Sequence, residues 1–165
     1  MSDLKDAEQR VVEAAVRLGL AISVRRMGQS TRTAEEAAAA VGCVLGQIVK
    51  SLVFRGRRSG QPRLLLVSGA NRVDEKAVAA RIGEPLGRPD AQFVRDITGF
   101  AIGGIPPFGH QSRLETFVDP DLLTFATVWA AAGTPESVFE IAPQALTVAT
   151  QATVMEMRQV INRSC

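Results

Sequence analysis

Apolar residues recur at helical spacing in five segments of the chain. From Asp3 to Leu18 they form one stripe, and Gly19 follows where such a helix would end. A second helix is predicted from Thr33 to about Val41, because Thr33 and Glu36 have the spacing of a capping box. Further helices are predicted for Asp74–Ile82, Ala91–Ile97 and Pro143–Thr150.

Short apolar runs between turn-forming residues predict strands. Ile48–Phe54 and Arg63–Ser68, joined by a polar segment, have the pattern of a hairpin. Other predicted strands are Leu20–Met27, Phe100–Gly103, Glu115–Val118, Thr124–Ala130 and Val138–Ile141, while Thr153–Val160 fits a strand or a helix. Because helices and strands do not alternate regularly, we expect one α+β domain over residues 1–165, built around a curved sheet.

Lys50 interrupts the apolar run of the predicted strand Ile48–Phe54. The two-residue period of a strand places Lys50 on the same face as Ile48, Leu52 and Phe54. Moving an ammonium group into apolar surroundings costs free energy unless an anion or oriented carbonyl groups meet it. Lys50 is therefore a candidate to bind a negatively charged ligand. The alternative is that it lies near a strand end and extends its ammonium group to water.

A loop rich in glycine and proline follows the predicted helix Ala91–Ile97. Between Thr98 and His110 the chain contains four glycines and the adjacent prolines Pro106 and Pro107. Glycine lets the backbone approach a ligand closely, and proline fixes φ and removes an amide donor. The segment is a candidate binding loop, and a strand entering a tight turn is the alternative.

Composition and charge narrow the class of protein. The 165 residues suffice for a sizeable core, and 46% hydrophobic with 22% charged residues is ordinary for a globular domain. No apolar stretch approaches the length that spans a bilayer, and the charged segment Met1–Arg17 is unlike a signal peptide. We therefore expect a cytoplasmic protein that makes no contact with a membrane.

A net charge of +2 argues against a general nucleic-acid coat, yet the arginines cluster. Arginine clusters suit phosphate groups. The two clusters are Arg25, Arg26 and Arg32, and Arg55, Arg57 and Arg58, of which the second could also be a solvated loop. With no tyrosine and one tryptophan, an aromatic platform for single-stranded nucleic acid is not expected.

Few residues are available for metal binding or nucleophilic catalysis. Cys43 and Cys165 are the only cysteines and His110 is the only histidine, so we expect no metal site, no cofactor and no disulfide. Any chemistry must then come from backbone groups, Lys50, hydroxyl groups or the substrate itself.

Three segments together resemble the YbaK/ProX family of free-standing aminoacyl-tRNA deacylases, which are similar to the editing domain of bacterial prolyl-tRNA synthetase. They are the lysine within Ile48–Val53, the run Ser68–Asn71 with Asp74 and Lys76 beyond it, and Thr98–Phe100 leading to Gly103–Gly109. The resemblance extends from about Leu20 to the C-terminus, and the order and spacing of the segments make it specific. It implies a mixed, barrel-like curved sheet with helices packed around it.

The resemblance also implies an activity, the hydrolysis of the ester between an amino acid and the terminal adenosine of mischarged tRNA. Lys50 matches the family lysine, which meets the ribose-phosphate end of the substrate. Gly104, Pro107 and Gly109 match the family's Gly-x-x-Pro-x-Gly loop, whose backbone lines the aminoacyl pocket. Because amides near Gly103 and Gly104 could stabilise an oxyanion, Lys50 and Gly104 are the candidate catalytic residues.

The other candidate residues are expected to bind the substrate. Ser68, Asn71 and Thr98 are interpreted as hydrogen-bonding groups, since no general base accompanies them. His110 directly follows the loop, where it could assist proton transfer or simply be a polar loop residue. Water, or a hydroxyl or thiol of the substrate, would attack an ester that is already activated.

The chain departs from cysteine-specific relatives at three positions of the expected pocket. Their aspartate falls on Val138, their tyrosine near Val24 and a small hydroxyl residue near Ala131, although Glu140 matches. The pocket would be more apolar, so a small aliphatic amino acid, serine or threonine is as plausible a substrate as cysteine.

The expected partner is the acceptor end of aminoacyl-tRNA, in particular tRNA-Pro carrying a small amino acid. Association with prolyl-tRNA synthetase and a homodimer are further expectations. The alternative function is a non-catalytic nucleic-acid-binding module that keeps the fold and the arginine cluster. A third hypothesis is that the protein binds a small molecule in the same pocket.

Overall fold

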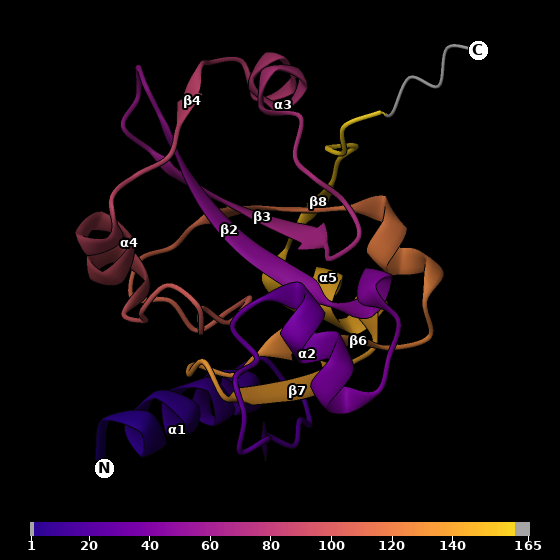
Figure 1. Cartoon of the computed structure of the whole chain (residues 1–165). Helices are drawn as coiled ribbons and strands as arrows, with labels where there is room; N and C mark the ends of the chain where they lie inside the picture. Colours follow the sequence, from indigo (N-terminus) through magenta and orange to yellow (C-terminus); the bar gives the residue numbers. More distant parts are fainter. Residues whose placement is uncertain (1, 161–165) are drawn as a thin grey trace.

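The computed structural model describes residues 2–160, which contain five α-helices, two short 3-10 helices and two β-sheets (Figure 1). The helices are α1 (Ser2–Arg17), α2 (Ala34–Val41), η1 (Leu45–Gln47), α3 (Glu75–Ile82), α4 (Ala91–Thr98), η2 (Pro120–Thr124) and α5 (Pro143–Thr150). The strands are β1 (Arg25–Arg26), β2 (Val49–Gly56), β3 (Pro62–Ser68), β4 (Leu86–Gly87), β5 (Glu115–Val118), β6 (Val128–Ala131), β7 (Ser137–Ile141) and β8 (Thr153–Val154).

The strands form one mixed sheet and one antiparallel sheet. The mixed sheet has the order β4-β2-β3-β5-β8, in which β2 is antiparallel to β3 while β3 and β5 are parallel. The second sheet has the order β1-β7-β6 and is antiparallel. A parallel bridge between Ile48 and Trp129 joins the two at one corner. The α+β class and the mixed sheet are confirmed, but within residues 2–160 the two sheets do not close into a barrel.

The helices begin and end where their caps predict. Thr33 and Glu36 form the capping box of α2, and Asp74 and Asp90 accept hydrogen bonds from the first turns of α3 and α4. Gly83 and Gly99 follow α3 and α4 in the left-handed conformation, which glycine adopts without steric cost. These helices are therefore determined locally, by residues within one turn of each end.

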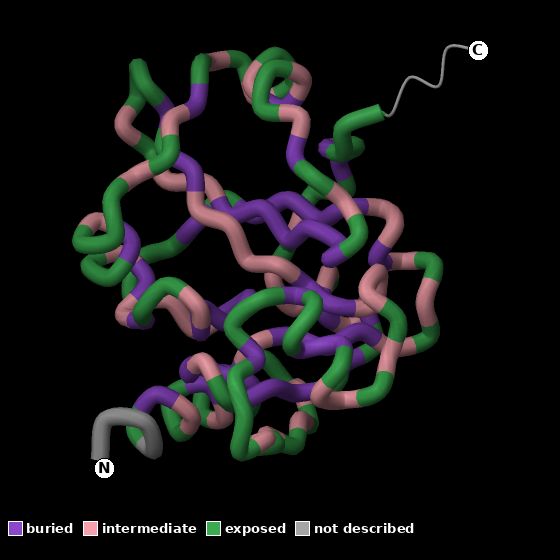
Figure 2. Tube along the Cα trace, in the orientation of Figure 1, coloured by how far each residue is buried: buried purple, intermediate pink, exposed green. Residues whose placement is uncertain are grey.

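The hairpin of β2 and β3 is confirmed, and it separates two regions of the core. Lys50 lies opposite Val67 and Leu52 opposite Leu65, while Leu64 to Ser68 are all buried. Because β3 is covered on both faces, its sequence is a continuous apolar run rather than an alternating one. Figure 2 shows β3 and its neighbour β5 mostly in the purple of buried residues, whereas the middle of β2 is intermediate.

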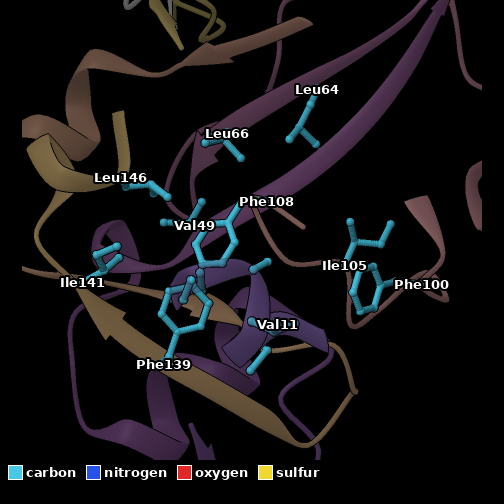
Figure 3. Packing of buried hydrophobic residues seen from close by; sticks show 14 of the residues in the cluster. Val11, Val49, Leu64, Leu66, Phe100, Ile105, Phe108, Phe139, Ile141 and Leu146 are labelled. Carbon is cyan, nitrogen blue, oxygen red and sulfur yellow. The ribbon is translucent and has the colours of Figure 1, made fainter. Parts of the chain in front are cut away.

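The larger core cluster fills the space between the two sheets and α1. Val11 of α1, Val49 of β2 and Phe139 of β7 meet there, and Phe108 packs on Phe139 with ring centroids 5.5 Å apart (Figure 3). On the other face of the mixed sheet a smaller cluster forms around α3; its members include Phe54, Leu65, Val67, Val78, Phe117 and Met157.

Three predicted strands are wrong or too long. Leu20–Met27 forms a ladder only at Arg25–Arg26, because its apolar residues pack on the core without a neighbouring strand. Phe100–Gly103 is a turn, with Gly103 at φ 102°. In the predicted strand Thr124–Ala130, Thr124 ends η2 and β6 begins only at Val128.

The ambiguous segment Thr153–Val160 is mostly irregular, with a two-residue strand at Thr153–Val154. Within residues 2–160 no helix combines the length and the apolar composition needed to cross a membrane.

Candidate functional site

A cavity of about 540 Å³ lies beside the corner where the two sheets meet. The start of α2, the first half of β2 and the turn after β3 form one side of it, and the glycine-proline loop and β6 form the other. Residues of the expected site among its lining are Lys50, Asn71 and Gly103. The fold thus brings together three segments that are widely separated in the sequence.

Lys50 lines the cavity. Its side chain is half-buried, and its ammonium group donates a hydrogen bond to the main-chain carbonyl of Asn71. Burial lowers the pKa of Lys50, an effect that Glu35 and Asp119 oppose and Arg72 reinforces. Because the surroundings do not fully solvate the ammonium form, an anionic ligand would stabilise it.

A buried carboxylate fixes the turn that holds Lys50. Asp119 is 0% exposed and accepts hydrogen bonds from the Ser68 N–H at 3.1 Å and from the Asn71 side-chain amide at 2.8 Å. The same amide donates to Asp121 at 2.8 Å. Asp119 thus positions the carbonyl group to which Lys50 donates. The sequence analysis missed Asp119; its one local signal is that it caps η2 ahead of Pro120.

Of the glycine-proline loop, Gly103 and Ile105 reach the wall of the cavity, together with Ile102. Gly104, Pro107 and Gly109 pack against the protein behind it instead. A Cβ atom at Gly104 would lie 2.7 Å from the backbone of Thr134, and one at Gly109 would lie 2.9 Å from Ala14 of α1. The Gly104 N–H also donates to the Ala101 carbonyl at 3.1 Å. These glycines let the loop approach neighbouring backbone.

Ser68, Thr98 and His110 direct their polar atoms to the protein itself, and the residues that line the cavity do not include them. Ser68 donates to the Gly46 carbonyl and Thr98 to the Val94 carbonyl, each at 2.7 Å. The His110 Nε2 lies 2.7 Å from the Pro106 carbonyl, and burial lowers its pKa. That Ser68, Thr98 and His110 bind the substrate remains a prediction.

Arginines surround the cavity on its solvent side. Arg32 and Arg72 are exposed and line it, and the Arg32 side chain lies over Gly103, where a Cβ atom would meet its Nε at 2.8 Å. The Arg25 guanidinium is 5.0 Å from the ring centroid of Trp129, another lining residue. With Lys50 these side chains make the mouth of the cavity basic, and Glu35 is the one acidic lining residue among residues 2–160.

The second arginine cluster is used within the protein. Arg55 stacks on Phe93 at 4.3 Å and donates to the Gly60 carbonyl, while Arg57 donates to the Leu86 carbonyl. These contacts hold the tip of the β2–β3 hairpin. Of the two arginine clusters, the one that contains Arg32 adjoins the cavity, and the one that contains Arg55 and Arg57 does not.

Buried apolar side chains also line the cavity. Among them are Val49, Ile105, Ala130 and Val138. Val138 and Ala131, two positions at which the sequence departs from cysteine-specific relatives, are both in the lining. Within residues 2–160 no three His, Cys, Asp or Glu side chains gather as a metal site would require.

Comparisons with known proteins agree on one family. A family model described as "Aminoacyl-tRNA editing domain" matches residues 29–148. The chain is 35% identical over 117 residues to the "Uncharacterized protein YwhH" of Bacillus subtilis, covering 71% of this chain and 74% of that one. It is 26% identical over 128 residues to the "Putative Cys-tRNA(Pro)/Cys-tRNA(Cys) deacylase EbsC" of Enterococcus faecalis, covering 76% of each.

Solved structures extend the likeness to nearly the whole chain. A crystal structure of "a putative trans-editing enzyme for prolyl tRNA synthetase" superposes with a TM-score of 0.88 at 44% identity, covering 93% of this chain and 98% of that one. The crystal structure of "hypothetical protein APE2540" gives a TM-score of 0.84 at 29% identity, covering 91% and 99%.

Proposed function

The chain belongs to the aminoacyl-tRNA editing domain family, and from that membership we propose that it hydrolyses the ester bond of mischarged aminoacyl-tRNA. One observation carries the proposal beyond the family. Lys50, a half-buried lysine, lines a cavity whose other lining residues include two exposed arginines and several buried apolar side chains. An aminoacylated RNA terminus has the matching chemistry, because it combines a phosphate group with a small amino acid side chain.

Lys50 and the two arginines would contact different parts of the RNA. Lys50 would meet the phosphate or ribose next to the terminal adenosine, because an anion there offsets the cost of burying its ammonium group. Arg32 and Arg72 are exposed at the mouth, where they can contact phosphates further along the acceptor strand. Binding should therefore weaken steeply as salt is raised.

Ester cleavage would depend on position and electrostatics. Gly103 is the loop glycine on the cavity wall, whereas the Gly104 N–H already donates to Ala101. We therefore assign stabilisation of the developing oxyanion to the backbone at Gly103, with Gly104 in support. An aminoacyl ester is activated, so water or a substrate group held at the carbonyl carbon suffices as nucleophile.

The proposed substrate is tRNA-Pro charged with a small amino acid. The names of two relatives, the "Putative Cys-tRNA(Pro)/Cys-tRNA(Cys) deacylase EbsC" and the "putative trans-editing enzyme for prolyl tRNA synthetase", support this RNA. The apolar wall around Val138 and Ala130 supports a small side chain.

The test uses tRNA-Pro charged separately with alanine, serine, threonine and cysteine, and follows loss of the ester. We expect acceleration with at least one of them. Lys50→Met should lower kcat/KM by roughly 10- to 150-fold, the value of one charge-assisted hydrogen bond. Lys76→Met, an exposed lysine on α3 outside the cavity, is the matched control and should leave the rate unchanged.

Hydrolysis of none of the four would contradict the proposal. If salt-dependent binding to uncharged tRNA persisted in that case, the basic mouth of the cavity would instead favour a non-catalytic RNA-binding module.

A further inference from the structure

We propose that Ser51 selects substrates by hydrogen bonding to a hydroxyl or thiol group on the side chain of the amino acid to be removed. This inference rests on the proposed function and names the substrate class of the same site. Ser51 follows Lys50 in β2 and lines the cavity. Among the side-chain nitrogen and oxygen atoms buried within residues 2–160, the Ser51 hydroxyl oxygen alone has no hydrogen-bond partner.

Other buried hydroxyl groups of the protein are satisfied. Thr98 donates to Val94, Thr116 donates to the Leu114 carbonyl at 2.9 Å, and the hydroxyls of Thr134 and Ser137 are 2.6 Å apart. A buried hydroxyl without a partner costs stability, and a residue such as valine would fill the same position in a strand without that cost. Ser51 lines the cavity while its hydroxyl oxygen is itself covered, so an unsatisfied group here is best explained by a ligand that completes its hydrogen bond once the side chain turns about χ1 into the cavity.

The pleat of β2 places Ser51 on the same face of the strand as Val49, one of the apolar residues that line the cavity. Residues at odd positions of β2 share one face, and Val49 and Val53 on that face pack in the larger core cluster. Lys50 lies on the opposite face with Leu52, which packs against the smaller cluster. The group that approaches Ser51 is thus the amino acid side chain, while the RNA approaches Lys50.

The main chain at Ser51 also faces the cavity side of β2. The Gly69 N–H donates to Ile48 and the Gly56 N–H to Gln61, so even-numbered residues of β2 are the ones hydrogen-bonded to β3. The amide and carbonyl of Ser51 point to the other edge, where β4 pairs only with Arg55 and Gly56. The amide and carbonyl of Ser51 can hydrogen-bond to the amino and carbonyl groups that all amino acids share. The Ser51 hydroxyl can hydrogen-bond to the side chain, which differs between them.

A serine hydroxyl both donates and accepts, and it carries no charge. It would complement the hydroxyl of serine or threonine or the thiol of cysteine, and it gains nothing from alanine. A single neutral hydrogen bond corresponds to a preference of about tenfold. We therefore expect wild-type kcat/KM to favour seryl- over alanyl-tRNA-Pro by about that factor.

The experiment compares kcat/KM for seryl- and alanyl-tRNA-Pro in the wild type, Ser51→Ala and Ser51→Thr. We expect Ser51→Ala to bring the two substrates to near parity by slowing only the seryl ester. Ser51→Thr keeps the hydroxyl and should keep the preference. The control is Thr116→Val, which removes a buried strand hydroxyl outside the cavity and should leave the ratio unchanged.

Thermal unfolding gives a second readout. Because the Ser51 hydroxyl has no partner to lose, Ser51→Ala should leave Tm unchanged or raise it, while Thr116→Val, which loses a hydrogen bond, should lower it. An active wild type whose Ser51→Ala variant slows both substrates equally, keeps the wild-type ratio or loses Tm would overturn the inference alone. A wild type inactive on every charged tRNA would overturn the proposed function and this inference with it.

Discussion

At Lys50, burial disfavours the charged ammonium group, while neighbouring carboxylates favour it. Its desolvation lowers the pKa of the ammonium group, while the carboxylates of Glu35 and Asp119 act in the opposite direction. The hydrogen bond to Asn71 keeps the side chain directed along the cavity wall. An anionic ligand at this position would favour the ammonium form in the same way as the two carboxylates.

Titration of the three lysines of the chain tests this balance. With carbon-13 methyl groups on the lysines, NMR should show Lys50 losing its proton below the ordinary lysine pKa of 10.5, because its ammonium group is desolvated. Lys50→Arg assigns the signal. Asp119→Asn should lower the pKa of Lys50 further, since it removes a negative charge that favours the ammonium form. A Lys50 that titrates at or above 10.5 would contradict the account of the site.

At the scale of single elements, local hydrogen bonds decide how well a segment holds its shape. The tip of the β2–β3 hairpin is closed by Glu84, which accepts the N–H groups of Arg58 and Ser59 and the Ser59 hydroxyl. Arg63 pairs with the same carboxylate at 3.1 Å. Hydrogen bonds from Ser59 are the largest cause of a Glu84 pKa lowered from 4.5 to about 2.

Glu84 should therefore make the hairpin tip sensitive to acid. A carboxylate with a lowered pKa stabilises the folded state above its ordinary pKa of 4.5, and this contribution is lost as the pH falls through about 2. Glu84→Gln should remove that dependence and speed amide hydrogen exchange at Arg58 and Ser59 already at neutral pH. The control is Glu75→Gln, which removes the ion pair with the exposed Arg88 and no contact of Arg58 or Ser59; it should leave these two amides unchanged.

On the scale of the whole molecule, the cavity depends on contacts between segments that lie far apart in the chain. Gly104 packs on Thr134 in the turn between β6 and β7, and Gly109 packs on Ala14 of α1. Ile105 and Phe108, which lie between these two glycines in the sequence, pack in the larger core cluster (Figure 3). The loop is thus anchored from behind, which holds Gly103 and Ile105 on the cavity wall.

Gly104→Ala tests the anchoring. A Cβ atom 2.7 Å from the Thr134 backbone cannot be accommodated by moving a flexible side chain, so the loop must shift. We expect a loss of about 1–3 kcal/mol in the free energy of unfolding, measured by denaturant titration, and a lower kcat/KM because Gly103 moves with the loop. Ala101→Ser, at an exposed position of the same loop, should change neither quantity. A Gly104→Ala variant with wild-type stability would refute the anchoring.

The helices, the β2–β3 hairpin and the position of Lys50 among the apolar residues of a strand could be predicted from the sequence alone. Each depends on neighbours within a few residues: Thr33 with Glu36, Asp74 with Ala77, and the two-residue alternation around Lys50. Such local patterns are visible before folding.

Which of the candidate site residues line the cavity depends on long-range packing and could not be predicted from the sequence. Gly103 lines the cavity while Gly104, Pro107 and His110 do not, because the contacts of the loop with Thr134 and α1 set which of its residues face the cavity. The support that Asp119 gives to Asn71 crosses 48 residues of sequence, and the isolation of the Ser51 hydroxyl is defined by everything that packs around it. Long-range packing creates both, so no local pattern could show them.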